Sequence, residues 1–154
     1  DLPENLMIEQ SYFVIFPGAS SSGRLWPAKR FGELLLKLTG SNRGIAVLCG
    51  SRQERALCAR IIDSSGTEAL NLAGKTTLPE LVEVIRRAKF LVGNETSAVH
   101  IAAAVGTPSV CILGGGHYGR FLPYVVDSDE QIAPVPVDQL PGLIDCLNSS
   151  TSPF

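Results

Sequence analysis

The chain alternates between short runs that are apolar at every position and segments whose apolar residues recur every three or four positions. A run that is apolar throughout is typical of a β-strand covered on both faces. Strands are therefore predicted over residues 12–16, 44–49, 90–93 and 109–113, with a shorter one at 69–72 and a weaker one at 131–135.

The segments between these runs are predicted to be helices. Pro27 suits a first helical turn, and Phe31, Leu34 and Leu38 then recur at helical spacing before Gly40. Thr77 and Glu80 form a capping-box pattern at the start of another helix that runs to about residue 88. Further helices are expected over residues 53–62, 98–105 and 137–147.

Strand and helix alternate five or six times with short connections. This pattern predicts an α/β fold, namely a Rossmann-like, doubly wound parallel sheet of five or six strands with helices on both faces. In such sheets, ligands bind outside the carboxyl ends of the strands.

The chain has 154 residues, which fits one domain with a sizeable core. We expect the domain to span residues 12–148, between a linker at 1–11 and a tail at 149–154. The net charge of −2 gives no reason to expect nucleic-acid binding. No apolar run approaches the ~20 residues of a transmembrane span. The four cysteines form no CxxC pair, so reduced thiols in a cytosolic protein are expected rather than a metal site.

The first candidate site is the loop over residues 17–27. Its small residues and hydroxyls, Ser20 among them, could present donors to a phosphate that Arg24 would neutralise. The spacing matches neither a Walker motif nor Gly-x-Gly-x-x-Gly, so neither an ATPase nor a dehydrogenase is indicated. A solvated loop accounts for the same residues equally well.

The second candidate is the stretch from Asn94 to His100, where a buried strand passes into an Ala-rich helix. Backbone N–H groups and the positive end of the helix dipole favour anions there. Thr96 or Ser97 could cap the helix and contact phosphate oxygens. Glu95 could bind sugar hydroxyls or simply complement the dipole, and His100 could be a structural donor or a phosphate contact.

Two weaker candidates follow other strands. Gly115 lies in a run of three glycines that permits close backbone approach to a ligand, and His117 follows it; a flexible solvated loop is the alternative. Arg52 and Thr76 lie after the second and third strands, at the edge where a nucleoside would lie.

Taken together and in order, these motifs resemble the C-terminal half of the heptosyltransferase family, glycosyltransferase family 9, which has the GT-B fold. The resemblance covers residues 13–147. It rests on a Pro-Gly-Ala loop ending in Arg-Leu-Trp-Pro, a Gly-Ser after the second strand, Ala-Gly-Lys-Thr-Thr-Leu, Asn-Glu-Thr-Ser-Ala-Val-His and a glycine-rich exit loop.

The resemblance implies a domain that binds a nucleotide-sugar donor, typically ADP-heptose, and belongs to an inverting enzyme of lipopolysaccharide core or related glycan synthesis. It also implies roles for individual residues. Ser20 and Arg24 would contact the donor phosphates, Thr96 and Ser97 would hold the diphosphate with His100 nearby, Glu95 would face the sugar, and Arg52 and Thr76 would contact ribose and adenine. Gly115 and His117 would lie beside the sugar.

Two stretches of this chain differ from the usual family pattern. Glu95-Thr96-Ser97 stands where the family has Asp, Ser or Thr, and Gly, and Gly114-Gly-Gly-His117 stands where it more often has Phe-Gly-Pro-Thr. Both differences lie beside the expected sugar rather than the phosphates.

The resemblance further implies that the acceptor site and the catalytic aspartate base belong to an N-terminal domain. We therefore expect a part of a longer cytoplasmic enzyme, with residues 1–11 as the interdomain junction. No catalytic residue, metal or cofactor is expected in this part. Its partners would be an ADP-sugar and, through the other domain, a glycan or glycolipid acceptor. Any attachment to the inner membrane would belong to the acceptor half.

Two alternatives remain open at this point. The chain could be a stand-alone, non-catalytic module that binds nucleotide sugars. It could also be half of a sugar-nucleotide epimerase, which would need acid/base carboxylates for which Glu95 is the candidate.

Overall fold

The structure is a computed structural model that describes residues 2–18, 26–94 and 96–112. Its centre is a sheet of five parallel strands in the order β3-β2-β1-β4-β5. The strands are β1 (Tyr12–Phe16), β2 (Ile45–Leu48), β3 (Ala69–Asn71), β4 (Leu91–Asn94) and β5 (Ser109–Ile112). The helices are η1 (Glu4–Leu6), α1 (Ala28–Gly40), η3 (Arg52–Glu54), α2 (Arg55–Ser65), α3 (Leu78–Arg87) and α4 (Ser97–Val105).

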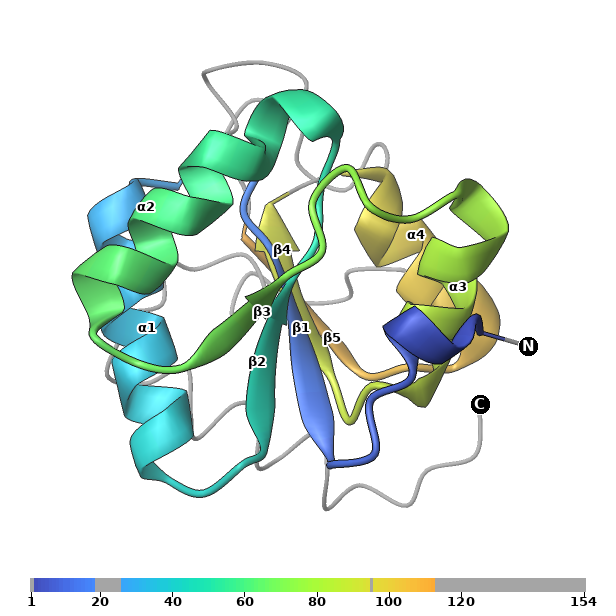
Figure 1. Ribbon diagram of the computed structural model, residues 1–154, viewed down its shortest axis with the longest axis horizontal. Coiled ribbons are helices and arrows are strands. Elements are labelled where there is room, and N and C mark those ends of the chain that lie inside the picture. Colours follow the sequence, from blue (N-terminus) through green and yellow to red (C-terminus); the bar gives the residue numbers. More distant parts are fainter. Residues whose placement is uncertain (1, 19–25, 95, 113–154) are drawn as a thin grey trace, which may run out of the picture.

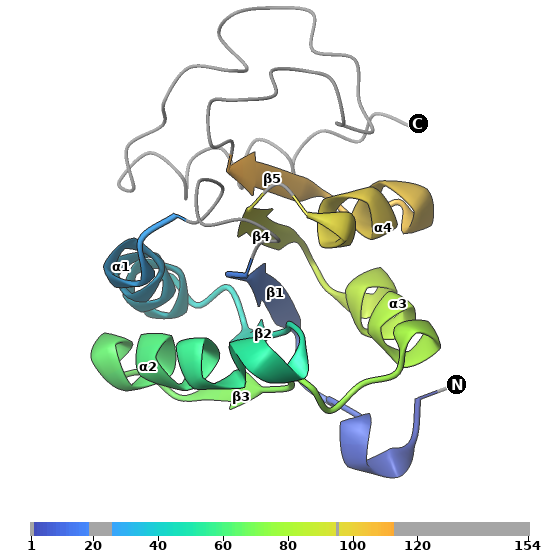
Figure 2. The same ribbon diagram turned by 90° about the horizontal axis from the view of Figure 1, so that it is seen from above.

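Helices cover both faces of this sheet. Figure 2, which looks along the strands, shows α1 and α2 on one side and α3 and α4 on the other. The side chains of β1 alternate accordingly: Phe13 and Ile15 pack with the residues of α1 and α2, whereas Val14 and Phe16 pack with those of α3 and α4. The prediction of a doubly wound α/β fold is confirmed.

The central strands are apolar throughout because each is buried on both faces. Every residue of β1 is buried, and the ring of Phe13 stacks on that of Phe90 at a centroid distance of 5.0 Å. Burying a side chain of this size contributes about 2 kcal/mol to folding. The core therefore holds the ends of the strands in fixed relative positions.

Most predicted elements lie within one or two residues of their expected bounds, and the capping box of Thr77 and Glu80 is present. The helix expected over residues 53–62 differs. It is preceded by the 3₁₀ turn η3 and continues to Ser65, because Gly66 ends it in the left-handed conformation with φ of 65°. The strand expected at 131–135 and the helix expected at 137–147 lie outside the described residues.

The segment expected to be a linker is packed on the domain. Leu2 and Leu6 are buried in the same apolar cluster as Val84 and Ile85 of α3. Two leucines within a short polar segment are too few to produce a recognisable period, so the sequence pattern did not indicate this packing. Whether the segment is also an interdomain junction stays a prediction.

The order of strands reverses between β1 and β4, because the chain leaves β3 at one edge and returns to pair beside β1. Figure 1 shows the strands rising to one common edge, where the loops leading into the helices gather. This edge, next to β1 and β4, is where doubly wound sheets bind their ligands.

Candidate functional site

Two of the helices that begin at this edge have amino ends closed by carboxylates of the protein. Ahead of α2, the backbone N–H of Ser51 donates to Oε2 of Glu54 at 2.6 Å. At α3, the N–H of Thr77 donates to Oε2 of Glu80 at 2.7 Å, and the N–H of Glu80 donates to Oγ1 of Thr77 at 3.4 Å. Hydrogen bonds from the Thr77 backbone and side chain lower the pKa of Glu80, so the box is held by a carboxylate.

The other two helices, α1 and α4, have amino ends without such a carboxylate among the described residues. Helix α1 follows Pro27, which provides no side-chain cap, and its first turn holds no acidic residue. Helix α4 is capped by Thr96, whose Oγ1 accepts the N–H of Ala98 at 3.3 Å, and its first turn is also free of acidic residues. Since β1 and β4 are neighbours, these two positive helix ends flank the point where the strand order reverses.

The side chain of Asn94 connects these two regions. It is fully buried at the end of β4, where its Nδ2 donates to the carbonyl oxygen of Pro17 at 2.7 Å. Its Oδ1 accepts the backbone N–H of Trp26 at 3.0 Å. Pro17 and Trp26 lie at the two ends of the connection between β1 and α1, so one amide group holds both ends of that loop.

Glycines let the loops after β1, β2 and β3 lie in close contact. A Cβ atom added at Gly18 would overlap the carboxyl group of Glu54, and one added at Gly50 would lie 2.6 Å from Oε2 of the same residue. Gly74, with φ of 70°, would bring a Cβ to 2.7 Å from Cα of Arg52. The loops after β1, β2 and β3 therefore touch one another at this edge rather than forming three separate turns.

Thr96, Ser97 and His100 are brought together at the first turn of α4, as predicted from their spacing. Ser97 and His100 are exposed and three residues apart, which places them on one face of the helix.

Arg52 and Thr76 lie on the other side of β1. Arg52 is exposed in η3, and Thr76 is half-buried in the loop after β3. Neighbouring strands are about 4.8 Å apart, so the ends of β2 and β3 lie roughly 10 and 14 Å from that of β4. An extended nucleoside diphosphate spans a distance of this order. Ser20, Arg24, Glu95, Gly115 and His117 lie outside the described residues.

Two features of this edge were not predicted. Asn94 was expected to follow the strand over residues 90–93, whereas it is the last residue of β4, and a polar side chain directly after an apolar run is the signal that could have indicated its role. Ser51 and Glu54 have the same Ser/Thr-x-x-Glu spacing as Thr77 and Glu80, and this second capping box was not recognised.

The described cysteines do not suggest a metal or redox site. Burial raises the pKa of Cys49 to about 12 and is the main cause of a similar value for Cys58, so both remain neutral thiols at neutral pH. The structure brings no three potential metal ligands together among the residues it describes. Along the same part of the chain, none of the helices combines the length and apolar character needed to span a membrane.

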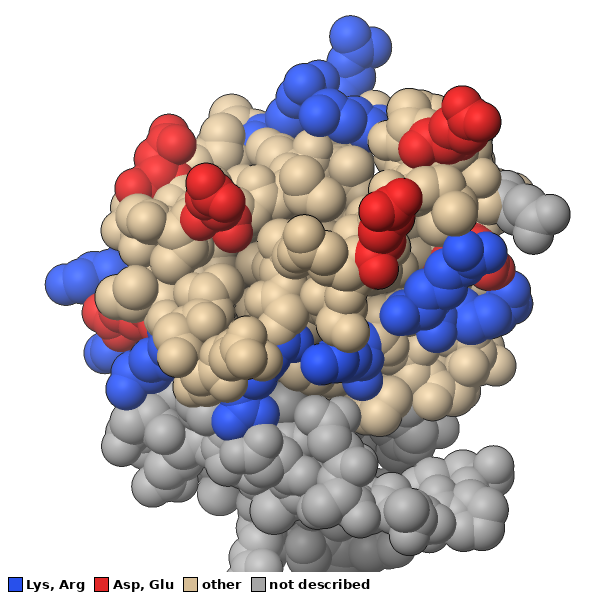
Figure 3. Space-filling view, turned by 60° about the horizontal axis from the view of Figure 1, so that its bottom comes forward, with Lys and Arg blue, Asp and Glu red and all other residues tan. Residues whose placement is uncertain are grey.

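Figure 3 shows the side of the molecule toward the amino ends of the strands, where basic and acidic side chains share one face. At the opposite, carboxyl edge, backbone N–H groups and the amino ends of helices are the features that favour an anion.

A parallel sheet in the order β3-β2-β1-β4-β5, with open helix ends beside its switch point, defines a doubly wound α/β domain of the type that binds nucleotides. The chain belongs to glycosyltransferase family 9 (heptosyltransferase), whose family model matches residues 3–133. The resemblance seen in the sequence motifs is thereby confirmed.

Among its relatives, lipopolysaccharide heptosyltransferase 3 of Escherichia coli K12 is 30% identical over 122 residues, which are 77% of this chain and 35% of the relative. Lipooligosaccharide heptosyltransferase 2 of Haemophilus influenzae is 31% identical over 114 residues, which are 71% and 33% of the two chains. The chain thus spans about a third of the length of these curated relatives.

Solved structures of the family share the fold. The E. coli ADP-heptose lipopolysaccharide heptosyltransferase II superposes with a TM-score of 0.74 at 19% identity, over 96% of this chain and 52% of that one. The E. coli heptosyltransferase WaaC with ADP gives a TM-score of 0.74 at 20% identity, over 96% and 46%. A family 9 glycosyltransferase of Veillonella parvula gives 0.76 at 18%, over 90% and 46%.

Proposed function

We propose that this chain is the donor-binding part of an inverting glycosyltransferase that uses an ADP-sugar of the heptose type. Its acceptor would be the lipopolysaccharide core or a related bacterial glycan. The curated relatives are lipopolysaccharide and lipooligosaccharide heptosyltransferases, and solved family structures have ADP or an ADP-heptose analogue as their ligand.

The observation that carries this proposal is the pair of helix ends at the switch point. The amino ends of α1 and α4 lack a carboxylate among the described residues, and they flank neighbouring strands. Two such ends suit a ligand that carries two adjacent negative groups, which is what a diphosphate presents.

The proposed roles follow from position. Thr96, Ser97 and His100 would contact the diphosphate from α4, and Ser20 and Arg24 from the loop after β1. Arg52 and Thr76, beyond β1, would contact ribose and adenine. Glu95, Gly115 and His117 would lie beside the donor sugar. No metal or cofactor is invoked.

In the transfer step, an acceptor hydroxyl oxygen forms a bond to the anomeric carbon while the bond from that carbon to the diphosphate breaks. The hydroxyl proton passes to a base that we expect in a separate N-terminal domain, and ADP leaves. The described residues would act on the leaving group, because fixed N–H donors stabilise the negative charge that develops on it.

Calorimetric titration of the chain with ADP tests the proposal. We expect ADP to bind more tightly than UDP or GDP, and Arg24→Ala to reduce the affinity by at least tenfold because one cationic contact to phosphate is lost.

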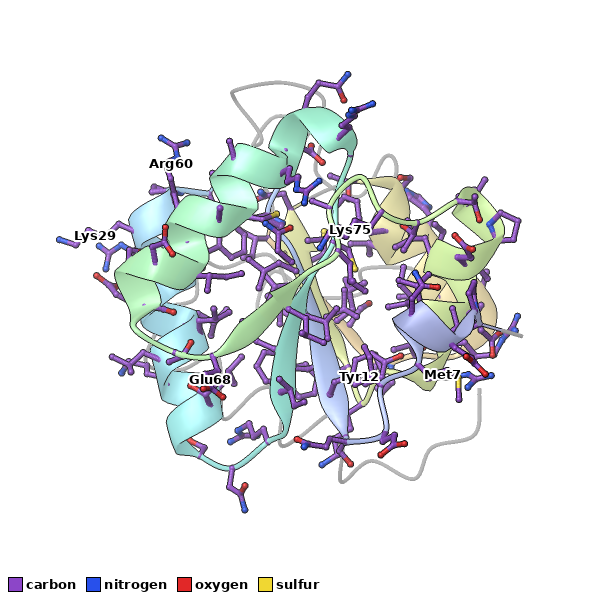
Figure 4. All side chains as sticks on the ribbon, in the orientation of Figure 1. Met7, Tyr12, Lys29, Arg60, Glu68 and Lys75 are labelled. Atoms are coloured by element: carbon purple, nitrogen blue, oxygen red, sulfur yellow. The ribbon has the colours of Figure 1, made fainter. Side chains whose placement is uncertain are left out.

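Arg60→Ala is the matched control for Arg24→Ala. Figure 4 shows Arg60 projecting outward from α2 at the side of the molecule, and it is exposed. Removing it changes the net charge equally and should leave the affinity unchanged. Absence of binding to any nucleoside diphosphate would overturn the proposed function.

A further inference from the structure

The buried amide of Asn94 is the polar side chain that joins the two halves of the proposed site. We propose that Asn94 is a positioning residue, which holds Pro17 and Trp26 at the two ends of the connection from β1 to α1 and so fixes the amino end of α1 relative to that of α4 for the donor diphosphate. This inference rests on the proposed function, because it takes the diphosphate to lie between these two elements.

The geometry supports a clamp with two arms. One arm is the 2.7 Å hydrogen bond from Asn94 Nδ2 to the carbonyl oxygen of Pro17, and the other is the 3.0 Å bond from the N–H of Trp26 to Asn94 Oδ1. The two backbone groups lie nine residues apart in the chain and are held by one side chain. The two hydrogen bonds thereby restrain Pro17 and Trp26 relative to each other.

Packing also restrains both ends of the connection between β1 and α1, so the two hydrogen bonds of Asn94 join residues that are already held in place. The indole of Trp26 meets the ring of Phe31 edge to face at 4.9 Å, and Gly18 lies directly against the carboxyl group of Glu54. Asn94 itself is fixed, because β4 pairs with β1 on one side and with β5 on the other.

The clamp requires an asparagine. Its side chain offers one donor and one acceptor at the end of a short stem, which is what a carbonyl oxygen and an N–H group need together. Aspartate would keep the acceptor but place a second acceptor 2.7 Å from the Pro17 oxygen, in a fully buried position. Serine or alanine would leave at least one of the two backbone groups without this partner.

The position of Asn94 links the clamp to ligand binding. Thr96, which caps α4, follows Asn94 by two residues along the same strand end. A change at Asn94 therefore loosens Trp26, and with it the amino end of α1, relative to the amino end of α4. A ligand that contacts both helix ends must then meet the cost of ordering them, which weakens binding without removing any contact to the ligand.

The test compares Asn94→Asp and Asn94→Ala with Thr107→Val in the 154-residue chain. Thr107 is also buried and donates from Oγ1 to the carbonyl oxygen of Ile85 at 2.8 Å. It precedes β5, however, and so lies at the amino ends of the strands, away from the proposed site. It therefore controls for the loss of a buried side-chain hydrogen bond. The alanine variant keeps the test available should a buried carboxylate prevent folding.

Two measurements are made well below the unfolding temperature of every variant. The first is the affinity for ADP, followed by calorimetry and by the fluorescence of Trp26, the only tryptophan in the sequence. We expect both Asn94 variants to bind ADP about tenfold more weakly and Thr107→Val to stay within about twofold of wild type. The second is hydrogen exchange at the Trp26 amide, which we expect to accelerate at least tenfold in the Asn94 variants alone.

Each outcome is decisive. Unchanged exchange at Trp26, or an equal loss of ADP affinity in Thr107→Val, would overturn the role of Asn94. If the wild-type chain binds no nucleoside diphosphate, the proposed function fails together with the ligand-positioning role, while Trp26 exchange shows separately whether Asn94 holds the loop.

Discussion

The helices α1, α2, α3 and α4 reach the same edge of the sheet with their amino ends, yet these ends are completed in two ways. Ahead of α2 and at α3, a Ser or Thr hydroxyl and a Glu carboxylate of the protein satisfy the first backbone N–H groups. At α1 and α4, no carboxylate among the described residues does so. The difference follows position: the two open ends follow β1 and β4 at the switch point, and the two closed ends follow β2 and β3, which lie farther across the sheet from it.

The closed and open ends differ in the source of the acceptors for their first backbone N–H groups. An orphan N–H group must find an acceptor, and an acceptor within the chain contributes about 1 kcal/mol to stability. An end that is left open forgoes part of this stability and keeps its donors for a ligand. The strand ends next to these helices differ as well. The buried residue after β2, beside a closed helix end, is the weakly polar Cys49, whereas the buried residue that ends β4, beside an open helix end, is the polar Asn94.

Placing a carboxylate on an open end should convert it into a closed one. In Ser97→Asp, the new side chain lies in the first turn of α4, where it complements the dipole and raises the melting temperature slightly. The same charge repels a diphosphate, and we expect the affinity for ADP to fall about 100-fold, or about 2.7 kcal/mol. Thermal unfolding and calorimetric titration of one preparation measure both effects.

Ser97→Asn is the control for this change, because asparagine has nearly the shape of aspartate without its charge. It should lose much less affinity than Ser97→Asp. Equal losses in the two variants would mean that shape rather than charge governs this position, and the distinction between open and closed ends would fail there.

A matched pair of threonine variants tests the same comparison, with a smaller expected change in ADP affinity. Thr77 caps α3 and Thr96 caps α4, each accepting a backbone N–H at 3.3–3.4 Å. We expect Thr77→Ala to lower the free energy of unfolding by about 1 kcal/mol and to leave ADP affinity unchanged. Thr96→Ala should weaken ADP binding about fivefold to tenfold in addition to any loss of stability.

Urea unfolding gives the free energy of unfolding of each variant, and ADP titration gives the affinity of each. If Thr77→Ala weakens ADP binding as much as Thr96→Ala does, the closed end takes part in the site and the proposed division is wrong.

The fold could be predicted from the sequence because each strand carries its own signal. Residues 12–16 and 90–93, which form β1 and most of β4, are short apolar runs, and the capping box at Thr77 marks the start of α3. The packed segment before β1 could not be predicted, because Leu2 and Leu6 join the core through contacts with α3, which is distant in the sequence. A local pattern does not contain such contacts.

The site was predictable in part for the same reason. The grouping of Thr96, Ser97 and His100 follows from helical spacing alone. The clamp of Asn94 was not predictable, because its partners Pro17 and Trp26 lie 77 and 68 residues away and are brought together by the pairing of β4 with β1. Family membership added the expected ligand, which spacing alone left open.

The smallest expected effect concerns the strand end on the closed side. Cys49 is 1% exposed, and burial raises the pKa of its thiol from 9.0 to about 12, so the folded chain keeps it neutral in mildly alkaline solution while the unfolded chain releases its proton. This stabilisation is present below pH 9 and is lost as the pH rises from 9 to 12, and the loss at pH 9.5 is on the order of 1 kcal/mol. Cys49→Ala should therefore lose less stability than wild type between pH 7.5 and 9.5, whatever its stability at neutral pH. Parallel pH profiles from urea unfolding would show instead that the end of β2 admits water.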